Sequence, residues 1–202
     1  MGDGGMMKLR DYAQIHTGYT FRGSLKERTQ GNTAIIQTGD ATQEGVAQPD
    51  QFARAQLDQL PAHYLLCPGD LIFRARGLVN TCALITEPLV RTICIAPLIF
   101  IRIVVPTELL PAYLQWFINL PGTQKQIDTF ARGSTVRMIS VEAMMSLNLV
   151  VPTLETQKEI IATTQLQQQI LLVETELVQK RHHYTEQALL QYAKANLIQA
   201  CA

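Results

Sequence analysis

The sequence predicts an α+β fold: a mixed, β-rich globular domain with a few helices over residues 1–152, then one long coiled-coil helix over residues 153–202. Short apolar runs bounded by Gly and Pro dominate the first part, which is typical of strands. The second part contains no Gly or Pro over the 44 residues from Thr156 to Gln199. With 47% hydrophobic and 17% charged residues, the chain can bury a core, which excludes a disordered protein.

Strands are expected at short apolar runs bounded by turn residues such as Gly in the first part. Pro88 and Pro97 interrupt the longest apolar region, so a strand there is either broken or lies at a sheet edge. A short apolar strand is expected to close the domain before Pro152. The predicted strands cover residues 34–37, 70–73, 82–85, 93–105 and 149–151.

Three short helices are expected in the globular domain, over residues 108–119, 123–131 and 141–147. Thr107 is the predicted cap of the first, and Pro111 falls in its first turn, where proline is tolerated. Pro121 and Gly122 are expected to end that helix. Ser140 is the predicted cap of the third.

The long helix is predicted from a capping box at Thr156–Glu159 and from its apolar spacing. A helix over 44 residues is about 66 Å long at about 1.5 Å per residue. Five apolar residues at spacings of 4, 3, 4 and 7 form the predicted coiled-coil seam: Leu166, Ile170, Val173, Leu177 and Tyr184. An amphipathic helix of this length needs a partner helix. The alternative is a surface helix that packs back on its own domain.

Several functional classes are excluded by what the sequence lacks. It contains no P-loop, no G-x-S-x-G nucleophile elbow and no G-x-G-x-x-G. Four scattered cysteines have neither disulfide-framework nor zinc-knuckle spacing, and they favour a reducing, cytoplasmic location. His182 and His183 are adjacent on the helix and point about 100° apart, which does not suit one metal. We therefore expect no catalytic site, no metal and no cofactor.

No membrane span is expected either, because the longest apolar run ends at Arg102 and is far shorter than the roughly 20 residues that a membrane helix needs. The formal charge of zero excludes a partner bound by charge alone.

Arginine use gives the first indication of a partner. Ten of the 13 cations in residues 1–150 are arginine, whose planar fork suits guanine edges and phosphates. Several lie in segments rich in Gly, Ser and Thr, where backbone and hydroxyl groups also contact phosphate. The candidate DNA-binding residues are Arg22, Lys26, Arg28, Arg74, Arg76, Arg132, Ser134, Thr135 and Arg137. On composition alone, a role as surface salt-bridge partners stays open for them.

Five segments resemble, in order, one half of the specificity (S) subunit of type I restriction–modification systems. They are Leu9–Gly18, Ile35–Asp40, Leu66–Phe73 with Gly77 after it, Tyr113-Leu114 through Gly133-Ser-Thr135 to Ile139-Ser140, and Leu147–Ile160. Each is short, and together they span residues 9–160. One departure is Thr153-Leu-Glu-Thr156 in place of the more usual Pro-Pro-Leu-Glu-Glu of that family, and Thr156 still offers a helix cap.

This resemblance implies a target-recognition domain for double-stranded DNA (1–152) and one spacer helix (153–202). The full S subunit has two of each, so it implies a homodimer through antiparallel helices. The expected partners are a DNA methyltransferase subunit and, as a further partner, a restriction subunit. The competing hypothesis is a non-DNA adaptor with a coiled-coil stalk. Arginines clustered on one concave face would favour DNA; arginines dispersed into salt bridges would favour the adaptor.

Overall fold

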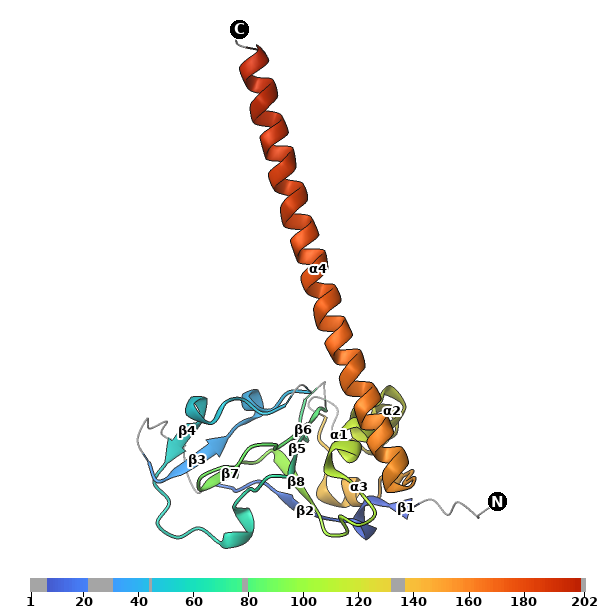
Figure 1. Cartoon of the computed structure of the whole chain (residues 1–202). Helices are drawn as coiled ribbons and strands as arrows, with labels where there is room; N and C mark the ends of the chain where they lie inside the picture. The colour runs from blue at the N-terminus through green and yellow to red at the C-terminus, as the bar shows by residue number, and fades with distance from the viewer. Residues whose placement is uncertain (1–6, 22–30, 44, 78–79, 132–136, 201–202) are drawn as a thin grey trace, which may run out of the picture. The chain divides into compact units, whose positions relative to one another are not determined.

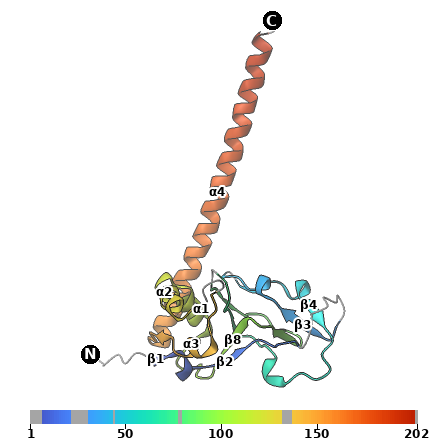
Figure 2. The same ribbon diagram turned by 180° about the vertical axis from the view of Figure 1, so that it is seen from behind.

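The computed structural model describes residues 7–21, 31–43, 45–77, 80–131 and 137–200. They form two compact units, divided between Lys158 and Glu159, and Figures 1 and 2 show the chain from opposite sides. The first unit holds β-sheets and short helices, and the second is helical. The predicted α+β class, with a long C-terminal helix, is therefore confirmed.

A four-stranded antiparallel sheet forms the centre of the first unit. Its strand order is β2 (Ala13–Thr17), β8 (Leu98–Ile103), β5 (Leu71–Arg74) and β6 (Cys82–Leu84). Phe100 of β8 is level with His16 of β2 on one side and Ile72 of β5 on the other. The predicted strands near residues 70 and 82 are thus confirmed. The first of them, β5, pairs both with β6 and with β8, which lies in the apolar region predicted as broken.

A three-stranded sheet lies against it, with β3 (Thr33–Ile36) in the middle. β4 (Ala53–Ala55) pairs with β3 antiparallel, and β7 (Thr92–Cys94) pairs with it parallel. The break predicted near Pro97 is confirmed, because β7 ends at Cys94 and β8 begins after the proline in the other sheet.

A third, two-stranded pair joins residues from the two ends of the first unit. β1 (Met7–Lys8) pairs antiparallel with β9 (Asn148–Leu149). β9 is the strand predicted at 149–151, shifted by one residue and shorter. Its pairing explains how a segment near residue 150 is tied to the start of the chain.

The main core fills the space between the two larger sheets. Because side chains alternate along a strand, Ile72, Leu98 and Phe100 all lie on one face of the four-stranded sheet. They pack against residues of the three-stranded sheet and its loops, among them Ile36 and Phe52. The other face carries residues such as Leu71, Phe73, Ile99 and Ile101, all buried; three short helices lie on this side (Figures 1 and 2).

Three short helices cover that second face. They are α1 (Pro111–Asn119), α2 (Pro121–Phe130) and α3 (Val141–Met145). The predicted cap of α3 is confirmed, because Ser140 Oγ accepts a hydrogen bond of 3.1 Å from the N–H of Ala143.

The predicted starts of the first two helices are wrong. α1 begins at Pro111, not at Glu108, because the residue before a proline is driven out of the helical region, and Leu110 is indeed extended. α2 begins at Pro121, two residues before the predicted start, with the proline again in the first turn. Both helices use the fixed φ of a proline at their first position, and Thr107 does not cap α1.

The long helix α4 runs over Leu154–Ala200. Its cap is Thr153, not the predicted Thr156, because Thr153 Oγ1 accepts from the N–H of Thr156 at 3.3 Å. The carbonyl of Thr153 also accepts the N–H of Gln157 at 2.9 Å, as expected of the residue that caps a helix. The substitution seen in the sequence at 153–156 therefore supplies a cap one turn earlier than predicted.

Gln157, in the first turn of α4, is fully buried within the first unit. Its Oε1 accepts the N–H of Leu110 at 2.9 Å, and its Nε2 donates to the carbonyls of Glu108 (2.6 Å) and Pro152 (2.8 Å). Both amide hydrogens and the amide oxygen are thus satisfied. This side chain ties the start of α1 to the start of α4.

Candidate nucleic-acid interface

Arg102 and Asp70 form a buried ion pair inside the first unit. Arg102 donates to both carboxylate oxygens, with Nε–Oδ1 at 2.7 Å and Nη2–Oδ2 at 2.6 Å. Nη2 also donates to the carbonyl of Leu65, and Asp70 is 1% exposed. The hydrogen bond with Asp70 raises the pKa of Arg102. This arginine holds β8 to the turn before β5, and its Nε and Nη2 donors already form hydrogen bonds inside the fold.

Two further arginines also serve the fold. Arg91, whose φ is 43°, donates to Thr33 Oγ1 (3.0 Å) and to the carbonyl of Leu57 (2.7 Å). Arg54 donates to the carbonyl of Gly31 at 2.9 Å. Arginine content alone therefore overstates how many cations of this domain are available to a ligand.

Two segments that carry predicted DNA-binding residues lie side by side. The N–H of Ile139 donates to the carbonyl of Ala75 at 2.8 Å, and the N–H of Gly77 donates to that of Arg137 at 3.2 Å. Arg76 and Met138 form an isolated antiparallel bridge between them. These contacts bring 74–77 and 137–139, about 60 residues apart in the sequence, into one pair; we call them the paired segments.

The three arginines of the paired segments differ in their surroundings. Arg76 is exposed and has no hydrogen bond or ion pair with the described residues. Arg74 is half-buried, and its Nε is buried without an acceptor. Arg137 is exposed and lies by Asp128, with Nη2 2.8 Å from the carbonyl and Nη1 3.7 Å from the carboxylate. Arg76 thus has donors left for an outside acceptor, whereas the unpaired Nε of Arg74 is shielded from solvent.

The remaining predicted DNA-binding residues lie outside the described residues, so their placement is not part of the site. They are Arg22, Lys26, Arg28, Arg132, Ser134 and Thr135. Arg132 to Thr135 are close in sequence to the paired segments, since the described chain resumes at Arg137.

A hollow of about 360 Å³ adjoins the paired segments, and sequence reasoning did not identify it. It is lined by Ala75 and Met138 of those segments, by His16 of β2, and by Ser140 and Glu142 at the start of α3. His16 is half-buried and stacks on Phe100, with 5.1 Å between the ring centroids. Nothing around His16 in the sequence predicts this, because the contact depends on the pairing of β2 with β8.

Burial lowers the pKa of His16, and the neighbouring His63 and Arg102 lower it further. The unfolded chain then binds a proton at this histidine more readily than the folded chain. The contribution of His16 to the free energy of unfolding is therefore full above the ordinary histidine pKa of about 6.5. It is lost as the pH falls from there through the lower pKa that His16 has in the folded chain. We expect His16→Gln to reduce the loss of unfolding free energy between pH 7 and pH 5, measured by urea denaturation.

The matched control for that variant is His182→Gln, because His182 is exposed on α4. It is expected to leave the slope of stability against pH close to that of the wild type. An unchanged slope in His16→Gln would show that other groups carry the acid sensitivity.

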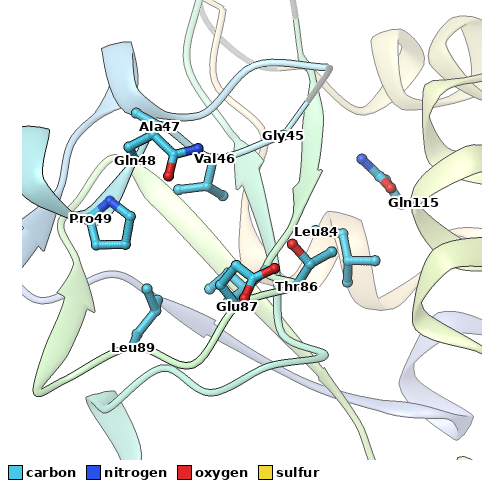
Figure 3. A pocket seen from close by; sticks show the side chains of 11 residues that line it. Gly45, Val46, Ala47, Gln48, Pro49, Leu84, Thr86, Glu87, Leu89 and Gln115 are labelled. Atoms are coloured by element: carbon cyan, nitrogen blue, oxygen red, sulfur yellow. The ribbon is translucent and has the colours of Figure 1, made fainter.

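A second hollow, of about 250 Å³, lies between the loop 45–49 and the end of β6 (Figure 3). Gln48, Thr86 and Gln115 line it, and Glu87 supplies the charged group among its lining residues. An anionic side chain without a cation does not suit a phosphate group. We therefore do not include this hollow in the nucleic-acid interface.

The described residues contain no group of three side chains that could hold a metal ion. Cys82 and Cys94 are buried free thiols. Burial raises the pKa of both, that of Cys94 to about 12, so neither is a thiolate near neutral pH. None of the helices in the described part of the chain is long and apolar enough to cross a membrane.

The second unit is the exposed remainder of α4, from Glu159 onward. All five predicted seam residues lie on it with their side chains exposed: Leu166, Ile170, Val173, Leu177 and Tyr184. Lys180, the polar residue at the next seam position, pairs with Glu176 at 2.7 Å. Residues outside the seam are apolar too, for example Leu171 and Leu190.

Comparison with known proteins gives one consistent result. No protein-family model and no curated protein matches the sequence. Among solved structures, the S subunit of the type I restriction–modification system from M. genitalium matches with a TM-score of 0.54 and 13% identity, over 80% of this chain and 38% of that one. The HsdS subunit from Thermoanaerobacter tengcongensis matches with a TM-score of 0.61 and 17% sequence identity, and the match covers 86% of this chain and 40% of that one.

A chain from a study of the assembly and conformational transition of the type I R-M system matches with a TM-score of 0.63 and 17% sequence identity. The match covers 86% of this chain and 40% of that one. This chain thus spans about two fifths of the length of the solved structures it matches. Over most of its own length, the chain has the fold of the S subunits of type I restriction–modification systems.

Proposed function

We propose that this chain is the DNA-recognition subunit of a type I restriction–modification system and acts as a homodimeric half-subunit. In this proposal it targets methyltransferase subunits, and in a larger assembly restriction subunits, to a bipartite inverted-repeat site. It does so in the cytoplasm, with no catalytic residues and no cofactor of its own. The observation that carries the proposal is the shared fold over 80–86% of this chain but only 38–40% of the S chains.

The exposed apolar seam of α4 supports a dimer, because a long amphipathic helix needs a partner helix. One globular domain (proposed as 1–152) and one long helix (153–202) correspond to rather less than half of a solved S chain. Two copies would therefore supply the two recognition domains of a bipartite site. A two-fold dimer presents two identical reading surfaces in opposite directions, so its site is an inverted repeat. The paired helices set the gap between the half-sites.

The proposed DNA contacts begin with Arg76. It is exposed and has no hydrogen-bond or ion-pair partner among the described residues. An arginine guanidinium can donate two hydrogen bonds at once to acceptors of one guanine or of one phosphate. The six candidates outside the described residues stay proposed DNA contacts on the sequence alone. Because the chain has no net charge, we expect weak, salt-sensitive binding alone and tighter binding with the methyltransferase, which would add phosphate contacts.

The alternative, a non-DNA adaptor with a coiled-coil stalk, is favoured by one observation. Arg54, Arg91 and Arg102 are tied to the fold by hydrogen bonds, and Arg137 is paired with Asp128. An adaptor needs no free cations on its globular domain. The two functions differ in whether a free arginine such as Arg76 affects DNA binding.

Coexpression with the cognate methyltransferase subunit, followed by sequencing of modified positions in genomic DNA, tests the proposal. We expect methylation at a bipartite site with dyad symmetry, and Arg76→Ala is expected to weaken binding to that site by about 10–100-fold, the effect of one bidentate base contact. The matched control is Arg10→Ala, since Arg10 is also exposed but pairs with Asp11. A modified site without dyad symmetry would contradict the dimer, and no modification at all would favour the adaptor.

A further inference from the structure

Two histidines from different elements meet at the edge of the four-stranded sheet. His16 lies on β2, the edge strand, and His63 belongs to the short 3-10 helix Ala62–Tyr64. Their ring centroids are 6.0 Å apart. His16 is half-buried and His63 is exposed, so neither residue is closed off from solvent. Neither histidine is among the proposed DNA contacts.

Arg102 supplies a third basic group from the neighbouring strand β8. Its Cζ lies 5.8 Å from the centroid of the Phe100 ring, on which His16 stacks at 5.1 Å. The Nε and Nη2 atoms of Arg102 donate to Asp70 and Leu65. Its Nη1 forms no hydrogen bond with the described residues, and its side chain is 30% exposed. This guanidinium therefore has donors left. We call His16, His63 and Arg102 the basic cluster.

The neighbouring charges that act on His16 are positive. Burial lowers its pKa, and then His63 and Arg102 lower it further; none of the described carboxylates is among these causes. Asp70 is already engaged, because its oxygens accept from Arg102 and from the N–H of Cys67. A group of basic side chains without a free counter-ion favours an anionic ligand.

The donors of the basic cluster suit a phosphate group. Imidazolium and guanidinium N–H groups make the charge-assisted hydrogen bonds that phosphate oxygens accept. Gln14 adds a neutral donor, because it is exposed, lies on the same face of β2 as His16 and is level with Arg102. A metal ion suits the cluster less, since the described residues supply no third ligand and Arg102 repels a cation.

The basic cluster also lies close to the proposed DNA contacts. His16 lines the same hollow as Ala75 and Met138 of the paired segments. Phosphates recur at every nucleotide along both strands of a duplex. A duplex that reaches Arg76 therefore presents several phosphates near this edge of the sheet.

We infer that the basic cluster binds one phosphate of the DNA backbone and that the complex takes up a proton as it forms. The choice of DNA as the source of the phosphate rests on the proposed function, whereas the anion site does not. A bound phosphate favours the charged imidazolium, so it raises the pKa of both histidines. A group whose pKa is higher in the complex than in the free chain binds a proton on association. DNA affinity therefore rises as the pH falls through these two pKa values.

Histidine NMR with the full chain tests the anion site, because the chain has only four histidines. The imidazole C–H signals are followed from pH 8 to pH 5.5 in sodium sulfate and in sodium chloride of equal ionic strength. Sulfate is the probe because its charge, unlike that of inorganic phosphate, stays constant over this range. We expect sulfate to raise the pKa of His16 and His63 and to leave those of His182 and His183 unchanged. An equal rise at all four would be a general salt effect and would overturn the site.

DNA binding at two pH values tests the source of the phosphate. The probe is a mixed-sequence duplex, because phosphate contacts do not depend on sequence, and the measurement is fluorescence anisotropy. The wild type is expected to bind more tightly at pH 6 than at pH 8. His16→Gln is expected to lose about threefold to tenfold of that gain, the effect of raising one pKa by about half to one unit. At pH 8 the variant is expected to match the wild type.

The control for this measurement is His183→Gln, because His183 is exposed on α4. It is expected to keep the full gain in affinity between pH 8 and pH 6. Circular dichroism at both pH values checks that each variant is folded.

The outcomes separate this inference from the function on which its DNA source rests. A sulfate effect on both histidines, with an equal gain in DNA affinity in wild type and His16→Gln, overturns DNA as the source. The absence of a sulfate effect overturns the anion site, while Arg76→Ala still measures DNA recognition. A sulfate effect without any DNA binding at either pH overturns the proposed function and leaves the anion site.

Discussion

Asp70→Asn is expected to lower the free energy of unfolding by about 3 kcal/mol, the lower end of what is lost when one partner of a buried ion pair is removed. Asp70 is 1% exposed and receives two hydrogen bonds from Arg102, whose side chain is 30% exposed. The amide keeps the volume but cannot balance the guanidinium. The measurement is urea denaturation, read as a lower midpoint with an unchanged slope.

The control is Asp128→Asn, because Asp128 pairs with Arg137 at 3.7 Å on the surface. Exposed pairs contribute about 0–1 kcal/mol, so this variant is expected to stay close to the wild type. The double variant Asp70→Asn, Arg102→Gln is expected to recover part of the loss, because it removes the unpaired charge. Equal losses in Asp70→Asn and Asp128→Asn would mean that the buried pair does not stabilise the fold.

The turn before β5 explains why Asp70 occupies this position. The N–H of Cys67 donates to Asp70 Oδ2 at 2.9 Å, and the N–H of Asp70 donates back to the carbonyl of Cys67 at 3.1 Å. Gln37 and Asp40 make the same reciprocal bonds, at 2.7 and 3.0 Å. Both turns have the sequence Gly-Asp, preceded by Thr38 in one and by Pro68 in the other. The sequence motif therefore predicts a local turn, because an aspartate readily binds the backbone N–H three residues before it.

What the same motif does not predict is the partner across the sheet. Arg102 stands 32 residues after Asp70, and nothing near it distinguishes it from Arg74 or Arg76, which have unused donors. The strand pairing of β5 with β8 makes the difference. Apolar runs locate strands because burial is a local property of a segment, whereas the role of each arginine depends on which strand becomes its neighbour.

Helix boundaries depend partly on local residues, Pro111 at the start of α1 and Thr153 before α4, and partly on a contact between residues far apart in the sequence. Thr107 and Thr156 are both good local caps, yet α1 and α4 begin elsewhere. The starts of both helices are held by Gln157, whose amide bonds backbone groups at Glu108 and Leu110. A hydrogen bond that spans 47 residues leaves no trace in local propensity. The helical position of the five seam residues, by contrast, follows from a local heptad pattern, and their exposure is observed; their role as an interface stays a prediction.

Gln157→Ala is expected to lower the free energy of unfolding by about 2–4 kcal/mol. It leaves one buried N–H and two buried carbonyls without partners, at roughly 1–3 kcal/mol for a lost buried hydrogen-bonding group, and it opens a cavity. The matched control is Gln168→Ala on the exposed part of the same helix, which is expected to change stability by less than about 0.5 kcal/mol. Chemical denaturation followed by circular dichroism measures both.

Gln157→Glu tests the direction of these hydrogen bonds. A carboxylate has no donor, so it would face the carbonyls of Glu108 and Pro152 without bonding them, and its burial penalises the charged form. The pKa of such a glutamate is raised in the folded chain, so its destabilisation is full near pH 7 and shrinks as the pH falls and the acid regains one donor. We expect the difference from the wild type to narrow between pH 7 and pH 5. A difference that stays constant over this range would mean that the amide hydrogens do not hold the starts of α1 and α4 together.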